Sequence, residues 1–386
     1  MEKGRLTRRN LLASAGGLAG LATVPVNAAG KHERLLITRI DLHRVVVPMK
    51  PGTTYDPEVA ESSRFDLVPK TIMKVHTDAG IIGIGETGRG EDEAGVRRNA
   101  DYLRGKHAFD LNLNRLDLPS RAGYAAFEMA LYDAVGKALG WPVYKLLGGL
   151  AQRKVLVGYW TGRKTPNGIR PVIEKTLAGG FTSIKTKCAQ GDPVVQVAEV
   201  VAKMAPGVKL IVDPNTRYRS YNDFLPVARD LDRVGNVLVL EDPFDKRDFN
   251  GYRELRRQVK AHVALHLGDP RAMVEAIREQ ACSVFNTGGN PGMADFVGNC
   301  YLAQAAGMSV WHGSGNDLGI VDASYLHSCA ASPACTLPSD ILSFLREDDL
   351  IVDPIEIKNS YAIVSDRPGL GVDLDEEAVR RYAVKS

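Results

Sequence analysis

The chain has 386 residues, of which 44% are hydrophobic and 25% are charged, as in an ordinary globular protein. This length allows two domains, or one barrel with a smaller domain attached. The formal net charge of +3 comes from residues 1–29, where four basic residues stand against one acidic residue, so the remaining residues sum to zero. That neutral balance argues against nucleic acid, and against an anionic membrane, as a partner.

Residues 1–29 resemble an export signal. Arg8 and Arg9 form a twin-arginine pair, an apolar run follows over 11–26, and small residues at 26–29 suit cleavage. The run is too short and too rich in glycine for a membrane span, which needs about 20 apolar residues. The pattern predicts a Tat-type signal peptide and a periplasmic or otherwise exported protein that leaves the membrane after cleavage. An uncleaved anchor or a chance arginine pair is the alternative.

The first part after the signal is predicted to be β-rich and then helical. Apolar runs over 36–47, 70–76 and 81–85 are the predicted strands. The sequence TDAG at 77–80 indicates a hairpin turn between the last two of them. Residues 91–140 then show helical spacing, which the sequence GWP at 140–142 ends.

A glycine-rich sequence, GIGETG at 83–88, matches the dinucleotide-binding fingerprint. No helical pattern opens directly behind it, and no second strand completes a strand–helix–strand unit. Nicotinamide binding is therefore not predicted.

From residue 155 onward, short apolar runs alternate with helical stretches. The runs cover 155–160, 183–187, 210–213, 237–241, 263–267, 282–286, 308–312 and, weakly, 335–337. The helices between them include 193–204, 221–233, 271–280 and 293–306. Eight strands in this alternation predict a parallel α/β barrel, with a doubly wound open sheet as the alternative on pattern alone. Because the chemistry of such a barrel lies at the C-terminal ends of its strands, polar residues there are the candidate site.

Two lysines close the second run. Lys185 and Lys187 are two positions apart, so they share one face of the strand. Lysines that face a barrel interior are costly unless an anion lies between them, whereas on an exposed edge they would simply be solvated. The pair therefore indicates anion binding only together with other site residues.

Three carboxylates follow successive strands. Asp213 and Glu241 end the third and fourth runs, and Asp269 follows the fifth. Carboxylates that converge at a barrel mouth repel one another unless a divalent cation lies between them, and oxygen ligands favour Mg²⁺. The sequence therefore predicts a Mg²⁺ site, although Asp269 precedes a helix and could instead be its N-cap.

His312 ends the seventh run and is the predicted acid or base, because imidazole exchanges protons near neutral pH. A lone histidine is more often a satisfied core or loop residue. Among the other histidines, His266 is the one that could point into the barrel, just below Asp269.

These residues together resemble the enolase superfamily, in its mandelate racemase and muconate lactonizing branch. The similarity covers nearly the whole chain after the signal. The matching sequences are GIGE at 83–86, YKLLGG at 144–149, Lys185-x-Lys187, Asp213-x-Asn215, Glu241-Asp-Pro, Gly268-Asp269 in place of the family's Gly-Glu, the paired glycines at 288–289 and PGLG at 368–371. The resemblance implies an α/β fold in which a modified TIM barrel, (β/α)7β, spans 125–345. An α+β capping domain over 34–124 would be completed by the tail, 346–386.

The resemblance also implies an enzyme that removes the proton alpha to a carboxylate through an enediolate intermediate. The implied roles are Lys185, Lys187 and His312 in catalysis, Asp213, Glu241 and Asp269 as Mg²⁺ ligands, and Asn215 and Asn286 as substrate contacts. Mg²⁺ and Lys185 would hold the substrate carboxylate, with the two proton-transferring groups on opposite faces of the substrate. The implied partners are a small carboxylate, a sugar acid in the leading interpretation, and further copies of the chain.

Two regions depart from the family pattern. Racemases and dehydratases of this branch usually pair the seventh-strand histidine with an aspartate at the end of the sixth strand. Counted back from the glycines at 288–289, that position is occupied here by Ser283. His312 therefore lacks an orienting carboxylate unless Asp317 supplies one. The run 284–287 lacks the lysine of lactonizing types, and 336–339 has no clear carboxylate. Dehydration of a sugar acid is therefore the leading prediction, with a racemase, epimerase or cycloisomerase as the alternative. A non-catalytic binding protein on this scaffold is the second alternative, but it would not need the paired lysines and metal residues.

Overall fold

A computed structural model describes residues 34–386 except 53, 55, 60–65, 289–291 and 385–386. The predicted signal peptide at 1–29 and the second of the paired glycines, Gly289, lie outside the described residues. Within the described part of the chain, none of the helices is long and apolar enough to cross a membrane.

An antiparallel sheet and three helical segments form the capping region. Its strands, in the order β1-β2-β3, are β1 (Ile37–Pro48), β2 (Leu67–Thr77) and β3 (Ile82–Glu86), followed by α1 (Glu93–Leu103), η1 (Ala108–Asp110) and α2 (Tyr124–Leu139). The predicted hairpin is present: Gly80 adopts a positive φ of 72° and donates its N–H to the carbonyl of Thr77 at 3.1 Å. Glycine suits this turn because it has no Cβ to clash at positive φ.

Close packing explains the glycine-rich sequence of β3. A Cβ on Gly83 would lie 2.0 Å from the carbonyl oxygen of Ala130, and one on Gly85 would lie 2.1 Å from that of Ala126. These glycines therefore let the backbone of α2 rest directly on the strand. The predicted boundary at 124/125 separates α2 from the sheet that it covers.

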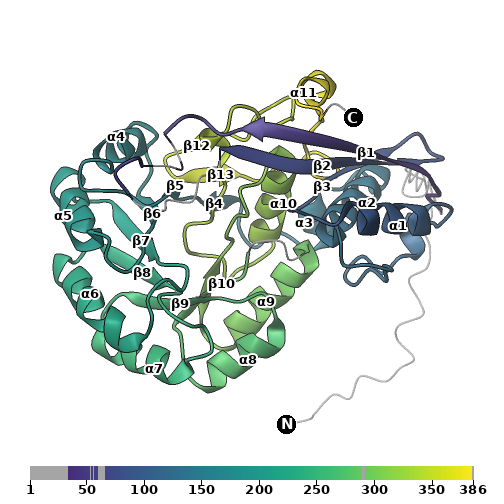
Figure 1. The fold of residues 1–386 in the computed structure, drawn as a ribbon. Helices are drawn as coiled ribbons and strands as arrows, with labels where there is room; N and C mark the ends of the chain where they lie inside the picture. The colour runs from purple at the N-terminus through teal and green to yellow at the C-terminus, as the bar shows by residue number, and fades with distance from the viewer. Residues whose placement is uncertain (1–33, 53, 55, 60–65, 289–291, 385–386) are drawn as a thin grey trace, which may run out of the picture. The chain divides into compact units, whose positions relative to one another are not determined.

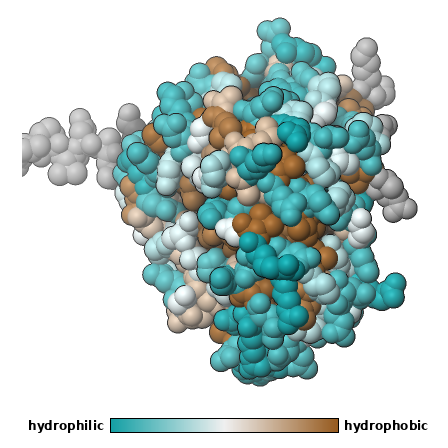
Figure 2. Space-filling view, turned by 90° about the vertical axis from the view of Figure 1, so that its left-hand side faces the viewer, coloured by the Kyte–Doolittle hydropathy of each residue, from teal (hydrophilic) through white to brown (hydrophobic). Residues whose placement is uncertain are grey.

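A curved parallel sheet surrounded by helices forms the second part of the fold (Figure 1). Its strands, in spatial order β11-β10-β9-β8-β7-β6-β5, are β5 (Tyr159–Thr161), β6 (Ser183–Lys187), β7 (Lys209–Asp213), β8 (Val237–Glu241), β9 (His262–His266), β10 (Val284–Asn286) and β11 (Ser309–Trp311). The helices are α3 (Val143–Leu146), α4 (Arg170–Ala178), α5 (Val194–Met204), α6 (Tyr221–Val234), α7 (Phe249–Gln258), α8 (Pro270–Arg278), α9 (Met293–Ala305) and α10 (Gly319–Ala330). Seen from the side of α4, α5 and α6, the surface is mainly hydrophilic, with hydrophobic residues in small groups between (Figure 2).

The weak eighth run closes the sheet into a barrel. Cys335 forms a parallel bridge with Val310, and Ser339 forms one with Val157, just before β5. This segment therefore joins the two ends of the seven-stranded sheet. The fold is a modified TIM barrel and not the open sheet that was the alternative.

Among the described residues, five buried apolar side chains form a cluster in the barrel interior, each from a different strand. They are Ile211, Val239, Ala264, Val284 and Trp311, all of which are buried. Because side chains alternate along a strand, residues two positions further on point to the same interior at the C-terminal ends.

The C-terminal tail returns to the capping sheet. First β12 (Ile357–Lys358) and β13 (Tyr361–Ile363) pair with β4 (Lys154–Leu156) in a separate three-stranded antiparallel sheet, and α11 (Glu376–Arg381) follows. The backbone N–H of Val384 then donates to the carbonyl of Arg44, and that of Val46 to the carbonyl of Tyr382, both at 2.9 Å.

A buried ion cluster joins the capping sheet to the loop after β11. Lys70 Nζ on β2 lies 2.6 Å from Asp317 Oδ1 and 3.3 Å from Oε1 of Glu86 on β3. Glu86 in turn accepts the backbone N–H of Leu318 at 2.7 Å. Since an unpaired charge is costly in such an interior, these contacts hold the capping sheet against the barrel mouth.

Candidate active site

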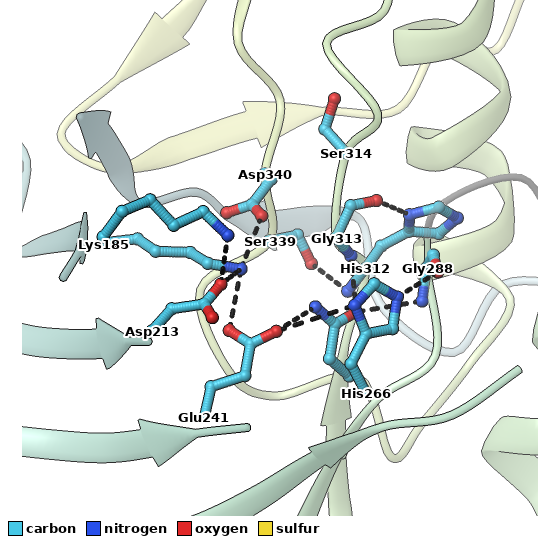
Figure 3. Close-up of polar contacts among 12 residues, drawn as sticks. Lys185, Asp213, Glu241, His266, Gly288, His312, Gly313, Ser314, Ser339 and Asp340 are labelled. Atoms are coloured by element: carbon cyan, nitrogen blue, oxygen red, sulfur yellow. Dashed lines mark hydrogen bonds and ion pairs between the residues drawn. The ribbon is translucent and has the colours of Figure 1, made fainter. Parts of the chain in front are cut away.

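The candidate site lies at the C-terminal ends of the parallel strands, where polar side chains continue the apolar interior. Asp213, Glu241, His266 and Asn286 each stand two positions after an interior residue of the same strand. They therefore point into the same barrel mouth. Figure 3 shows Asp213, Glu241 and His266 there, with Lys185 and the closing segment's Asp340 beside them.

One buried lysine holds three carboxylates together. Lys185 Nζ lies 2.8 Å from Glu241 Oε2, 3.2 Å from Asp340 Oδ2 and 3.4 Å from Asp213 Oδ2. Lys187 bonds the same oxygen of Asp213. Both predicted lysines and two of the three predicted metal ligands are thus in one cluster.

The charges of this cluster fix the protonation of Lys185. Burial alone would lower its pKa, but Asp340, Glu241 and Asp213 together raise that pKa well above its ordinary value. Burial would likewise raise the pKa of Asp213, yet Lys187 and Lys185 hold it below its usual range. Lys185 therefore stays charged and can bind an anion but cannot act as a base, whereas the side chain of Lys187 is 25% exposed at the cavity wall.

A polar cavity opens over the cluster. Its lining residues are Thr54, Arg89, Trp160, Gly162, Arg163, Lys185, Lys187, Asp213, Asn215, Arg217, His266, Asn286, Gly313, Ser314, Asn316 and Asp340. The two asparagines predicted to contact the substrate, Asn215 and Asn286, are both among them. Asn286 also donates to Glu241 Oε1 at 2.7 Å, so it orients that carboxylate. Lysine and arginine side chains outnumber carboxylates on this wall, which suits an anionic substrate.

Asp340 is a site residue that the sequence prediction missed. It directly follows Ser339, the last bridged residue of the closing segment, and is 3% exposed. The stretch 336–339 was predicted to lack a carboxylate, and the missing group lies one position beyond it. Asp340 could have been found in the sequence as the first carboxylate after the eighth apolar run.

The structure does not bring Asp269, the third predicted metal ligand, into the cluster with Asp213 and Glu241. Strand β9 ends at His266, so Asp269 lies three residues past the barrel mouth and is exposed. Its side chain caps α8 by accepting the backbone N–H of Arg271 at 3.1 Å. The N-cap alternative describes it correctly.

The structure also does not bring His312, the predicted acid or base, into the cavity that the two lysines line. Trp311 occupies the barrel interior, so the next side chain points outward, on the far side of Gly313 from Lys185 (Figure 3). The ring of His312 stacks between Tyr325 and Phe296, with centroid distances of 3.6 and 4.3 Å. Its Nδ1 donates to the carbonyl of Gly313 at 2.7 Å. His312 therefore lies in the packing between barrel and helices, outside the cavity.

The sixth strand ends at Asn286, as the apolar run 282–286 predicts, and not at the Ser283 position counted from the family pattern. Ser283 precedes β10, and its hydroxyl accepts the backbone N–H of Val263 at 3.1 Å. Asn286 takes the inward position and accepts the N–H groups of Gly288 and Gly313 at 3.0 Å each. Asp317, the suggested partner of His312, instead binds Lys70 and accepts the hydroxyl of Tyr325 at 2.8 Å.

The packed position of His312 predicts an acid-dependent loss of stability. Burial lowers its pKa to about 4, while an unfolded histidine titrates near pH 6.5. Between these values the unfolded chain binds a proton that the folded chain does not, so the free energy of unfolding falls as the pH falls. We expect His312→Gln to reduce this slope by up to about 1.4 kcal/mol per pH unit, measured by urea unfolding between pH 6 and pH 4.5. The exposed His262 is the control, and equal slopes in His262→Gln and His312→Gln would contradict the assignment.

His266 takes the place on the fifth strand that was predicted for Asp269. Its Nε2 lies 2.6 Å from the carbonyl oxygen of Gly288, and its Nδ1 lies 3.8 Å from Glu241 Oε1. Burial lowers the pKa of His266, although Glu241 opposes this shift. The ring is thus held neutral at the mouth of the barrel.

The donors at the barrel mouth fit a divalent cation. Asp213 and Glu241 offer carboxylate oxygens, which suit Mg²⁺, and one or two protein carboxylates are its usual complement. Glu241, Asp242 and His266 also offer ligand atoms that lie within 4.8 Å of one another. Asp242 is already engaged, because its oxygens accept the N–H of His266 at 2.9 Å and pair with Lys246 at 2.7 Å.

Comparison with known proteins agrees with this architecture. The chain matches the family model of the enolase C-terminal domain-like fold over residues 170–378, and that of the mandelate racemase/muconate lactonizing enzyme N-terminal domain over 46–148. The chain therefore belongs to the enolase superfamily, in its mandelate racemase/muconate lactonizing branch.

Relatives in this superfamily catalyse several reactions. The chain is 30% identical to an N-succinylamino acid racemase of Thermus thermophilus over 67% of this chain and 71% of the relative. It is 27% identical to a chloromuconate cycloisomerase of Cupriavidus pinatubonensis, covering 81% and 90%, and 28% identical to a probable glucarate dehydratase of Streptomyces coelicolor, covering 87% and 90%. These names identify the relatives as isomerases and lyases, and the chain is an enzyme of this kind.

Solved structures share the fold. An isomerase from Streptomyces coelicolor superimposes with a TM-score of 0.75 at 26% identity, covering 90% of this chain and 99% of that one. The muconate lactonizing enzyme from Pseudomonas fluorescens gives 0.80 at 22% identity, covering 91% and 100%.

Proposed function

We propose that this protein removes the proton alpha to the carboxylate of a sugar acid and then eliminates water, with Mg²⁺ bound at Asp213 and Glu241. The observation that carries this proposal is the cluster in which Lys185 and Lys187 meet Asp213 beneath a polar cavity. When bound there, Mg²⁺ would supply Lewis-acid polarisation of the substrate carboxylate.

The two lysines have different tasks. Lys185 keeps its positive charge among three carboxylates, so it attracts the substrate carboxylate and offsets the negative charge of the enediolate. Lys187 takes the alpha proton in its amine form, because it is the more exposed of the two lysines that line the cavity. The C–H bond breaks, and its electron pair moves onto the carboxylate.

Elimination on one face completes the reaction. Lys187, now protonated, returns its proton to the beta hydroxyl; the C–O bond breaks, and water leaves. The resulting enol converts to a 2-keto acid. In this route Lys187 is the acid in place of His312, because the ring of His312 packs outside the cavity. The polar lining, including Asn215, Ser314 and Asn316, favours a substrate with several hydroxyl groups.

A racemase, epimerase or cycloisomerase would share the first proton transfer and differ in the fate of the enediolate. The relatives named above support this second candidate.

We further propose that the chain is exported by the Tat route and acts as a homo-oligomer, in keeping with the twin-arginine sequence and the family resemblance.

Proton NMR in D₂O tests the reaction. The purified protein with Mg²⁺ is incubated with aldonic and aldaric acids and with N-acyl amino acids. We expect loss of an alpha-proton signal, growth of a 2-keto acid and complete inhibition by EDTA. Exchange with inversion would indicate a racemase or epimerase, and a lactone product would indicate a cycloisomerase. Absence of exchange for every compound, together with no Mg²⁺ binding by calorimetry, would contradict the proposal and favour a non-catalytic protein.

A further inference from the structure

We infer that His266 supplies an imidazole nitrogen to the bound cation in place of a third carboxylate, which gives this chain a mixed nitrogen and oxygen site. The inference deepens the proposed function and rests on it, because the cation is the one bound at Asp213 and Glu241.

The hydrogen bonds of His266 fix which ring nitrogen carries the proton. The carbonyl oxygen of Gly288 can only accept, so Nε2, at 2.6 Å, must be the donor. In a neutral ring, Nδ1 then carries a lone pair, and this lone pair faces Glu241 Oε1 at 3.8 Å. Two acceptors that face each other at this separation attract a cation between them.

The ring is also positioned as metal-bound histidines commonly are. Such histidines donate their second ring N–H to a backbone carbonyl or a carboxylate, which fixes ring orientation and raises ligand basicity. Here Gly288 supplies the carbonyl, and Asp242 anchors the backbone by accepting the N–H of His266 at 2.9 Å. His266 is therefore held at its side chain and at its backbone in the orientation that a ligand needs.

Glu241 is oriented toward the same point. Its Oε1 accepts from Asn286 at 2.7 Å and has a second lone pair, while its Oε2 pairs with Lys185. Asp269, by contrast, is exposed and caps the N-terminus of α8 through its Oδ1. The fifth strand thus brings a nitrogen, not an oxygen, to the barrel mouth.

A nitrogen ligand changes metal selectivity. Imidazole suits first-row transition metals, whereas Mg²⁺ prefers oxygen ligands in near-ideal octahedral geometry. The site should therefore favour Mn²⁺ or Co²⁺ over Mg²⁺ more strongly than the same site with a carboxylate at position 266. We expect His266→Asp to lower the ratio of Co²⁺ to Mg²⁺ affinity by about tenfold or more, measured by calorimetry.

Electron spin-echo spectroscopy of Mn²⁺-loaded protein tests the assignment without a substrate. Wild-type protein should show ¹⁴N modulation from a directly bound nitrogen, and ¹⁵N-histidine labelling should convert it to the ¹⁵N pattern. The modulation should disappear in His266→Asp and persist in Asp269→Asn, the matched control. The labelling experiment needs no variant, so it holds even if His266→Asp fails to fold.

The possible failures are distinguishable. Bound Mn²⁺ without nitrogen modulation, or modulation that survives in His266→Asp, would overturn the histidine ligand and leave the proposed reaction intact. Wild-type protein that binds neither Mn²⁺ nor Mg²⁺ would overturn both.

Discussion

Replacing Lys187 by methionine is expected to lower the rate of alpha-proton exchange by about 10²–10⁴-fold, the usual contribution of a positioned acid–base group. Methionine keeps the length of the side chain but cannot accept a proton. The loss should appear in kcat for any substrate identified by NMR. Metal affinity should stay the same or rise, because Asp213 loses a competing cation.

Two controls separate proton transfer from charge. Lys187→Arg keeps the positive charge, but a guanidinium cannot give up its proton in a protein, so exchange should be as slow as in Lys187→Met. Lys209→Met removes an exposed lysine at the opposite end of β7 and should leave exchange unchanged. Exchange at the wild-type rate in Lys187→Met would exclude this lysine as the base.

The barrel and four residues of the candidate site could be predicted from local sequence patterns. Short apolar runs mark the parallel strands, and Lys185, Lys187, Asp213 and Glu241 lie within the last three residues of clear strands. Each of these residues lies near the end of its apolar run and also points into the barrel. Their place in the site could therefore be predicted from the alternation of side chains along the strand alone.

The fifth and seventh strands show where this reasoning fails. Strands of a parallel barrel are buried on both faces, so an apolar run does not reveal which alternate residues face the interior. In the seventh run, Trp311 faces inward and His312 therefore faces the helices. In the fifth run, Ala264 faces inward, so His266 reaches the mouth and Asp269 does not.

Space at the barrel mouth supports the same assignment. A Cβ on Gly313, the inward position after Trp311, would lie 2.5 Å from Nδ2 of Asn286. Asn286 already fills this space, so the seventh strand brings only backbone to the site.

The cavity wall also includes three arginines from loops, Arg89, Arg163 and Arg217. In loops no periodicity relates the sequence to the direction of a side chain, so their place in the cavity could not be predicted without the structure.

Replacing Lys185 by methionine is expected to destabilise the fold by about 3–5 kcal/mol in EDTA, the usual result of removing one partner of a buried ion cluster. Asp213 and Glu241 are each 1% exposed and Asp340 is 3% exposed, so all three would be left without their shared cation. Urea unfolding at pH 7 measures the change. Activity should be lost as well, because the proposed reaction uses the same charge to bind the substrate carboxylate.

Two further measurements distinguish lost charge from lost packing. The double variant Lys185→Met, Asp340→Asn should recover part of the stability, since one buried carboxylate is removed with the lysine. Added Mg²⁺ should stabilise Lys185→Met more than the wild type, because the cation binds only the folded form and replaces the missing charge. It should not restore activity. If Lys185→Met were as stable as the wild type in EDTA, the carboxylates would not depend on this lysine, and its assigned role as the charged centre of the site would be wrong.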